Sequence, residues 1–246
     1  MLELRQATVT VGPKRILRDV SFKVASGSVH GLIGRNGAGK STTVKAILGL
    51  QPLASGEIYV SGHTLSKDPA AYKRPLGYIP ELPMLYQGLT VVEYLQFTAM
   101  AYGVPETVFH ERLPALLDRF EMAPHVNEMP TRFSKGMRQK MNVMAALIHD
   151  AQVLVVDEPF IGLDPVAIRT LKEDLHEVAK DGGCVLLTTH ALDIAESMCD
   201  AFTILDAGSV LASGTLSNLR ESLGTDSEAS LEDVYMSALQ HRVATA

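Results

Sequence analysis

The chain has 246 residues, of which 46% are hydrophobic, so it can build one large α/β domain, or such a domain with an inserted subdomain, without disulfide or metal staples. Its formal net charge of −6 argues against a protein whose main partner is a nucleic-acid backbone. No stretch approaches ~18 uncharged apolar residues and the first residues lack the pattern of a secretory signal, so we expect a soluble, intracellular chain.

The first third is predicted to be rich in strands. Residues 2–11 and 19–25 alternate apolar and polar side chains, which is typical of half-buried strands. Residues 29–33 are continuously apolar, which suits a strand buried on both faces. Residues 57–62 add a short strand and a turn. These features predict an N-terminal antiparallel β subdomain beside the first buried strand.

A glycine-rich loop follows that buried strand and matches the pattern G-x-x-x-x-G-K-[ST]. The candidate nucleotide-binding residues are Gly34, Arg35, Asn36, Gly37, Ala38, Gly39, Lys40, Ser41 and Thr42. Three glycines in six positions let the backbone turn its N–H groups inward, and the loop ends where a helix with apolar residues at Val44, Ile47 and Leu48 is expected to begin. We therefore expect a phosphate-binding loop with Ser41 on a Mg²⁺ ion. A turn without a ligand is disfavoured by this context.

The middle third changes to helical patterns and predicts a helical subdomain inserted in the α/β frame. Thr90 and Glu93 form a capping box that opens an apolar helix. Residues 113–120 keep helical spacing, but Pro114 is expected to kink that helix or split it in two. Ser134 precedes a helix whose methionine stripe is more typical of core packing than of a cofactor site.

The last third returns to alternating strands and helices. Residues 153–156 and 184–189 are predicted to be buried strands, and Asp164 and Pro165 open the helix between them as N-cap and first-turn proline. The pattern continues with a short helix at 191–199, strands at 201–206 and 209–212, and a final helix capped by Ser230 and Asp233. The cysteines at 184 and 199 have no metal-ligand spacing and are expected to be reduced and buried.

Two adjacent carboxylates, Asp157 and Glu158, end the strand at 153–156. Because successive side chains on a strand diverge, the two can serve different purposes. Asp157 is expected beside the phosphate loop, where it holds Mg²⁺. Glu158 is expected to face the γ-phosphate and to polarise the attacking water. A solvated strand end is the alternative, and the presence of the phosphate loop disfavours it.

With these motifs, the chain resembles the nucleotide-binding subunits of ABC transporters from its start to about Gly214. The remaining motifs occur in the family's order, at 78–81 (Q-loop), 134–137 (signature), 162–164 (D-loop) and 189–190 (switch histidine). The resemblance implies a P-loop NTPase fold of the ABC type, with ATP and Mg²⁺ as cofactors. An ordinary phosphate-loop enzyme lacks the signature motif.

The resemblance also implies a mechanism in which two subunits sandwich two ATP molecules head to tail. Ser134 and Gly136 of one subunit then contact the γ-phosphate bound by the other, and Asp164 contacts the partner. His190 is implied to contact the γ-phosphate in its own subunit. Glu81, at the Q-loop, is implied to join Glu158 and His190 in catalysis and to approach Mg²⁺ together with Ser41 and Asp157.

Three positions depart from the family pattern. Val11 stands where the family often stacks an aromatic residue on adenine, Glu81 replaces the Q-loop glutamine, and the signature reads Phe-Ser-Lys-Gly-Met from Phe133 instead of Leu-Ser-Gly-Gly-Gln. We expect weaker base discrimination from the first departure. The other two, with the ending at 231–235, look most like bacterial drug, antibiotic or ion export ATPases.

The implied function is the ATPase subunit of an exporter, peripheral on the cytoplasmic face of the cell membrane. Its implied partners are a second ATPase subunit, expected as a homodimer, and integral membrane permease subunits that dock at 78–86 and the adjoining helices through Leu85, Tyr86 and Leu89. The alternative for these three side chains is that they only pack the helical subdomain. No nucleic-acid partner is expected. The alternative is a soluble ABC ATPase in iron–sulfur assembly or in a nucleic-acid or ribosome-associated process. The expected organisation is an ATPase domain at 1–224, made of a core at 1–86 and 151–224 and a helical subdomain at 87–150, followed by a connector and helix at 225–246.

Overall fold

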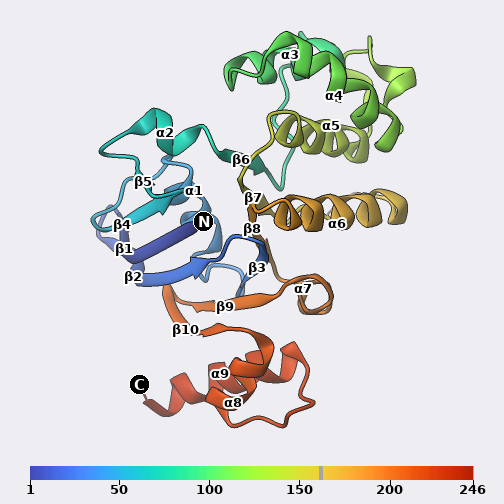
Figure 1. The fold of residues 1–246 in the computed structure, drawn as a ribbon. Helices are drawn as coiled ribbons and strands as arrows, with labels where there is room; N and C mark the ends of the chain where they lie inside the picture. The colour runs from blue at the N-terminus through green and yellow to red at the C-terminus, as the bar shows by residue number, and fades with distance from the viewer. Residues whose placement is uncertain (161–162, 246) are drawn as a thin grey trace.

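A computed structural model describes residues 1–160 and 163–245, and its elements are arranged around two sheets (Figure 1). The first is a four-stranded antiparallel sheet in the order β2-β1-β4-β5. Its strands are β1 (Leu2–Val11), β2 (Lys14–Val24), β4 (Ser55–Val60) and β5 (His63–Thr64). The side chains of Leu2, Leu4 and Val9 on β1 are buried, as expected for a strand with one face on the core. The antiparallel subdomain is therefore confirmed.

The second sheet has six strands in the order β10-β9-β3-β8-β7-β6. Its strands are β3 (Ser28–Ile33), β6 (Leu76–Ile79), β7 (Val153–Asp157), β8 (Cys184–Thr189), β9 (Ala201–Asp206) and β10 (Ser209–Gly214). All neighbours are parallel except β9 and β10. In register, Ile33 pairs with Thr189 and Asp157 pairs with Thr188, so the carboxyl ends of β3, β7 and β8 meet at one edge. That edge is where an open parallel sheet binds its ligand.

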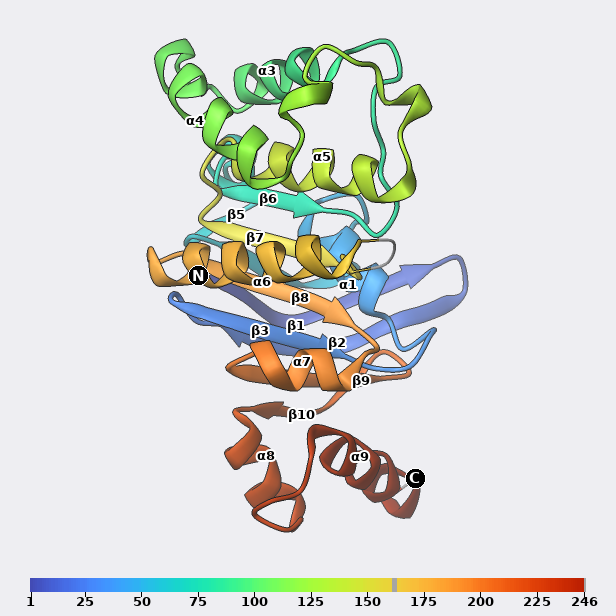
Figure 2. The same cartoon turned by 90° about the vertical axis from the view of Figure 1, so that its right-hand side faces the viewer.

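Helix α1 (Lys40–Ile47) packs between the two sheets, where Val44 and Ile47 join a core with residues of both. Helix α6 (Pro165–Lys180) packs on β3 and β8, and α7 (Leu192–Met198) lies beside the same strands. Helix α2 (Pro69–Lys73) lies beside β4 and β5. At the other end of the chain, α8 (Leu216–Leu223) and α9 (Leu231–Thr245) pack below β10 (Figures 1 and 2).

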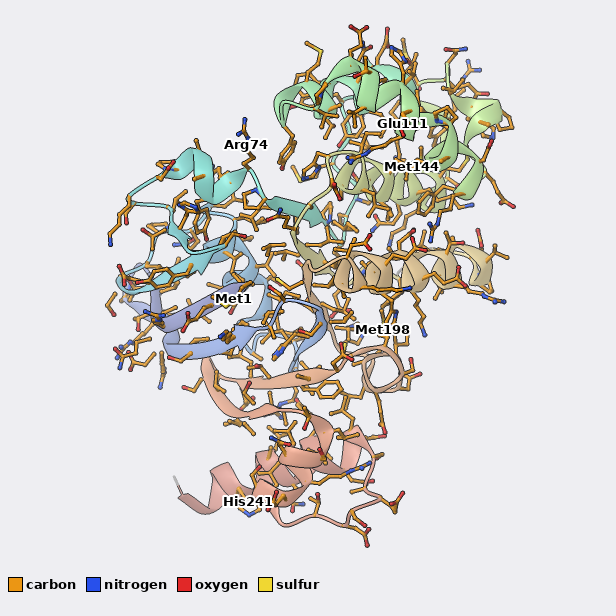
Figure 3. All side chains as sticks on the ribbon, viewed as in Figure 1. Met1, Arg74, Glu111, Met144, Met198 and His241 are labelled. Carbon is orange, nitrogen blue, oxygen red and sulfur yellow. The ribbon has the colours of Figure 1, made fainter. Side chains whose placement is uncertain are left out.

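A separate helical layer covers β6 and β7 at the top of the molecule (Figure 2). It consists of α3 (Val91–Ala101), α4 (Glu106–Arg119) and α5 (Lys135–Leu147), with single 3₁₀ turns at Ala123–His125 and Pro130–Arg132. Met141 and Met144 of α5 are fully buried in its core, so the methionine stripe packs as predicted (Figure 3 labels Met144).

Of the two outcomes expected at Pro114, a kink or a split, the split does not occur, since α4 is continuous through this residue. Pro114 lies on the exposed face of α4, so water can reach the carbonyl of His110 that loses its helical donor. The sequence analysis did not predict α2, β5, β6, α8 or the two 3₁₀ turns. The strand expected at 19–25 begins earlier, at Lys14. Within 1–160 and 163–245, no helix combines the length and the apolar character needed to span a bilayer.

Candidate functional site

The glycine-rich loop joins β3 to α1 and is shaped by close backbone contacts. A Cβ on Gly34 would lie 2.3 Å from the carbonyl oxygen of Leu205, so only glycine fits there. Gly39 precedes α1 with φ of 114°, which also favours glycine, and it supplies no side-chain cap to the helix. The first amides of α1 thus keep their hydrogen-bonding capacity for an anion.

Lys40 is buried under this loop. Its Nζ donates to the carbonyl oxygen of Gly34 at 2.6 Å and approaches that of Arg35 at 3.5 Å. Burial lowers the pKa of Lys40, and the carboxylates of Glu158, Asp157 and Glu81 oppose that shift. The cation and the carboxylates therefore share one electrostatic environment.

The ends of β7 and β8 hold the two adjacent carboxylates. The hydroxyl of Thr188 donates to a carboxylate oxygen of Asp157 across the sheet. The chain turns at Glu158, where φ is 45°, and the Glu158 amide donates to the carbonyl of Thr188 at 3.1 Å. This turn separates the two side chains, and Nδ1 of His190 lies 2.8 Å from Oε1 of Glu158.

One cavity of about 430 Å³ collects these groups. Its lining is Ile16, Arg35, Asn36, Gly37, Gly39, Lys40, Ser41, Thr42, Glu81, Asp157, Glu158 and His190. Segments from the loop, from the end of β6 and from the ends of β7 and β8 therefore meet as the sequence predicted. A larger cavity of about 620 Å³ lies between the antiparallel sheet and the helical layer, beside Arg74 (Figure 3), and contains none of the predicted site residues.

The oxygen donors at this cavity suit Mg²⁺. The hydroxyl of Ser41 and the carboxylates of Asp157 and Glu81 are hard ligands of the kind that Mg²⁺ prefers, and all three residues line the cavity. In the part of the chain that the structure describes, no group of three or more His, Cys, Asp or Glu side chains forms a metal site by itself. This arrangement suits an ion held partly by nucleotide phosphates.

The signature residues lie elsewhere. Ser134 caps α5 by accepting the amide of Met137 at 3.2 Å, and Phe133 is buried in the helical layer where the family pattern has leucine. Among the described residues that line the cavity, neither Ser134 nor Gly136 is present. Helix α5 belongs to the helical layer, whereas α1 lies next to the sheets (Figure 2).

Asp164 is the N-cap of α6, since its side chain accepts the amide of Ala167 at 2.8 Å. This hydrogen bond holds the pKa of Asp164 below its usual range. Lys140 of α5 lies 3.7 Å from Asp164 and 3.6 Å from Glu121, and so links the signature helix to this turn. Gly162 of the expected D-loop lies outside the described residues.

Two residues of the site escaped the sequence analysis. Ile16 lines the cavity, whereas Val11 is 52% exposed and does not belong to the lining. Thr188 supports Asp157 from the neighbouring strand. For Thr188, the sequence signal was a hydroxyl residue two positions before the predicted switch histidine. For Ile16, the sequence contains no signal other than its place in strand β2.

The expected docking residues divide into two groups. Leu85 and Leu89 are partly buried against the core of the helical layer, which fits the alternative that they pack the subdomain. Tyr86 is 60% exposed, as predicted. Its ring lies 5.4 Å from that of Phe97 on α3, measured between centroids. Leu82, Met84 and Met100 are further exposed apolar side chains on the same two segments, and we call these five residues the exposed apolar patch.

Comparisons with known proteins agree with these features. The family described as ABC transporter matches residues 17–161. The chain is 44% identical over 236 residues to the ABC-type transporter ATP-binding protein EcsA of Bacillus subtilis (strain 168), covering 96% of this chain and 95% of that protein. It is 34% identical to the linearmycin resistance ATP-binding protein LnrL of the same organism, covering 92% of this chain and 73% of that protein. A solved ATP-binding subunit of an ABC transporter superposes with a TM-score of 0.94 at 42% identity, covering 97% and 99% of the two chains.

Proposed function

The chain belongs to the family of ABC transporter ATP-binding proteins, which hydrolyse ATP, and we propose that it binds Mg²⁺-ATP as half of a head-to-tail pair of ATPase subunits. The proposed phosphate cradle is the loop at 34–42, in which backbone amides and Lys40 surround the β- and γ-phosphates. Ser41, Asp157 and Glu81 are the proposed ligands of Mg²⁺, which when bound neutralises charge on the phosphates.

Glu158 is the proposed residue that polarises the attacking water. Its carboxylate lines the cavity, and its contact with His190 at 2.8 Å fixes it against the neighbouring strand. His190 is mostly exposed at the rim, from which it can contact a γ-phosphate. Glu158 therefore supplies an acceptor for the water proton, and the doubly protonated form of His190 supplies a donor for the phosphate through its second ring nitrogen.

The head-to-tail arrangement is supported mainly by which residues line the cavity. The cavity holds the phosphate loop, Asp157, Glu158 and His190, while Ser134 and Gly136 are absent from its described lining. In the proposed pair, Ser134 and Gly136 at the N-terminus of α5 contact the γ-phosphate bound by the other subunit. Asp164 is the proposed contact across the same interface. A homodimer is the simplest form of this pair.

A separate membrane permease is the proposed partner of the exposed apolar patch. The patch groups five large apolar side chains on the segment after Glu81 and on α3, and exposed apolar groups of this kind mark interaction surfaces. Its position next to Glu81 links partner docking to the nucleotide cavity. We place the subunit on the cytoplasmic face of the cell membrane.

Export is the proposed direction of transport. It is supported by the linearmycin resistance protein and by the Nod factor export ATP-binding protein I of Cupriavidus pinatubonensis (strain JMP 134 / LMG 1197), which is 33% identical over 92% of this chain and 70% of that protein. We also propose the division into a core at 1–86 and 151–224, a helical subdomain at 87–150 and a C-terminal connector and helix at 225–246. The helical layer and the pair α8 and α9 support it.

The function is tested with Glu158→Gln, which keeps the shape of the side chain and removes its charge. We expect unchanged ATP binding, loss of ATP hydrolysis and an ATP-dependent dimer in size-exclusion chromatography with light scattering. Glu173→Gln is the matched control, because Glu173 lies on the exposed face of α6 and pairs only with Arg169 among its described contacts. Wild-type turnover in Glu158→Gln, or loss of turnover in the control, would contradict the proposal.

A further inference from the structure

Thr188 is a fully buried residue of β8 whose hydroxyl has a specific partner. It pairs in register with Asp157 of β7, and its Oγ1 donates to Oδ1 of that carboxylate. Asp157 is itself buried and lines the nucleotide cavity. The hydroxyl thus holds one oxygen of a carboxylate that borders the phosphate site.

The backbone of the same residue supports the next carboxylate. The carbonyl of Thr188 accepts the amide of Glu158 at 3.1 Å, at the position where φ of Glu158 becomes 45°. Thr189 stabilises the following turn, since its hydroxyl accepts the amide of Ala191 at 3.1 Å. The end of β8 therefore fixes the end of β7 through both a side chain and the main chain.

From this geometry we propose that Thr188 is a positioning residue that orients Asp157 toward the Mg²⁺ ion of bound nucleotide. The inference rests on the proposed function of the cavity. The terminal torsion of an aspartate has a broad preference, so the carboxylate plane is not fixed by its own rotamer. A donor on Oδ1 fixes that plane and leaves Oδ2 for the metal. Hydrogen bonds to metal ligands typically contribute 10–100-fold to metal affinity or activity.

The competing explanation is that the Thr188 hydroxyl only satisfies a buried polar group. In that case its removal would weaken folding without a specific effect on the metal. The two explanations predict different nucleotide binding with and without Mg²⁺. Within residues 1–160 and 163–245, no hydrogen bond joins Thr188 to the loop at 34–42 or to Lys40, so loss of the hydroxyl should not weaken binding of the phosphates by the loop.

The experiment measures the binding of the fluorescent analogue TNP-ATP to the purified chain, first in EDTA and then in a Mg²⁺ titration. We expect Thr188→Val to keep the wild-type affinity in EDTA and to raise the half-saturating Mg²⁺ concentration by about 10-fold or more. Thr188→Ser restores the hydroxyl and should restore the wild-type Mg²⁺ dependence. Thr203→Val is the control, because Thr203 is an equally buried threonine on β9 whose hydroxyl contacts His30 and Ser213.

Thermal unfolding shows whether each variant folds, and Thr188→Ala replaces Thr188→Val if the latter does not. An unchanged Mg²⁺ dependence in the variant without the hydroxyl would overturn the inference, and so would an equal loss of affinity in EDTA. Wild-type chain that binds no TNP-ATP would instead overturn the proposed function of the cavity, and the inference with it.

Discussion

Asp174 provides a quantitative test of the contact between the helical layer and the core. It lies on α6 with only 4% exposure, and Arg119 at the end of α4 reaches its Oδ1 at 2.6 Å. Arg119 also contacts Glu177 at 3.0 Å, while Oδ2 of Asp174 is buried without a hydrogen-bond partner among the described residues. Burial raises the pKa of Asp174 to about 7, because it outweighs the attraction of Arg119.

The substitution Asp174→Asn removes the titration and keeps the shape of the side chain. Since the folded-state pKa lies above the ordinary value of 3.8, the folded protein binds this proton more tightly than the unfolded chain. This tighter proton binding adds to the unfolding free energy. The contribution is fully present below about pH 4 and is lost as the pH rises through about 7. Between pH 5 and pH 8, the wild-type chain should lose about 2–3 kcal/mol of unfolding free energy from this group alone.

Urea unfolding of both proteins at pH 5 and pH 8 measures this loss. The difference between the unfolding free energies, variant minus wild type, should increase by about 2–3 kcal/mol from pH 5 to pH 8. Asp181→Asn is the control, because Asp181 is exposed after the end of α6. A constant difference between wild type and Asp174→Asn would refute a raised pKa for Asp174.

Three further substitutions probe the nucleotide cavity. Lys40→Ala should abolish TNP-ATP binding because it removes the buried cation beside the phosphates. The control Lys45→Ala, on the exposed side of α1, should keep binding. Equal affinity of Lys40→Ala and wild type would refute the phosphate-loop assignment. Val11→Tyr should tighten ATP binding by about 1 kcal/mol if a ring at this position stacks on adenine, and a fluorescence titration that shows no gain would exclude base stacking at position 11. Glu81→Gln should keep ATPase activity but alter its coupling to transport in the intact complex, and unchanged coupling would remove Glu81 from the link between patch and cavity.

The sequence predicted which residues meet at the cavity, because its motifs follow buried strands. Residues 29–33, 153–156 and 184–189 are apolar runs that fit strands buried on both faces, and in the sheet order β3-β8-β7 their carboxyl ends are neighbours. Polar residues just after these strands therefore meet without further information. Caps such as Ser134 and Asp164 were predictable for a similar reason, since a cap bonds to an amide three residues away.

Features that depend on neighbours distant in sequence were not predictable in this way. Ile16 lines the cavity only because β2 lies against the parallel sheet, and Thr188 faces Asp157 only through the register of β7 and β8. Leu85 and Leu89 have the same apolar character as exposed docking residues, but the helical layer partly buries them. Pro114 did not split α4 because its face of the helix is exposed, which the local sequence could not show.

The most direct test of the head-to-tail proposal mixes two inactive variants. Glu158→Gln lacks the group that polarises water. Gly136→Asp places a negative charge where the signature should meet the γ-phosphate. The variant should still fold, because an acidic residue in the first turn suits helix α5. In a mixed pair of the head-to-tail kind, one site has both an intact Glu158 and an intact signature. Mixing equal amounts should therefore restore ATPase activity to about a quarter of the wild-type level, as expected for random pairing. Mixtures that remain inactive, although the mixed dimer forms, would contradict a site shared between two subunits.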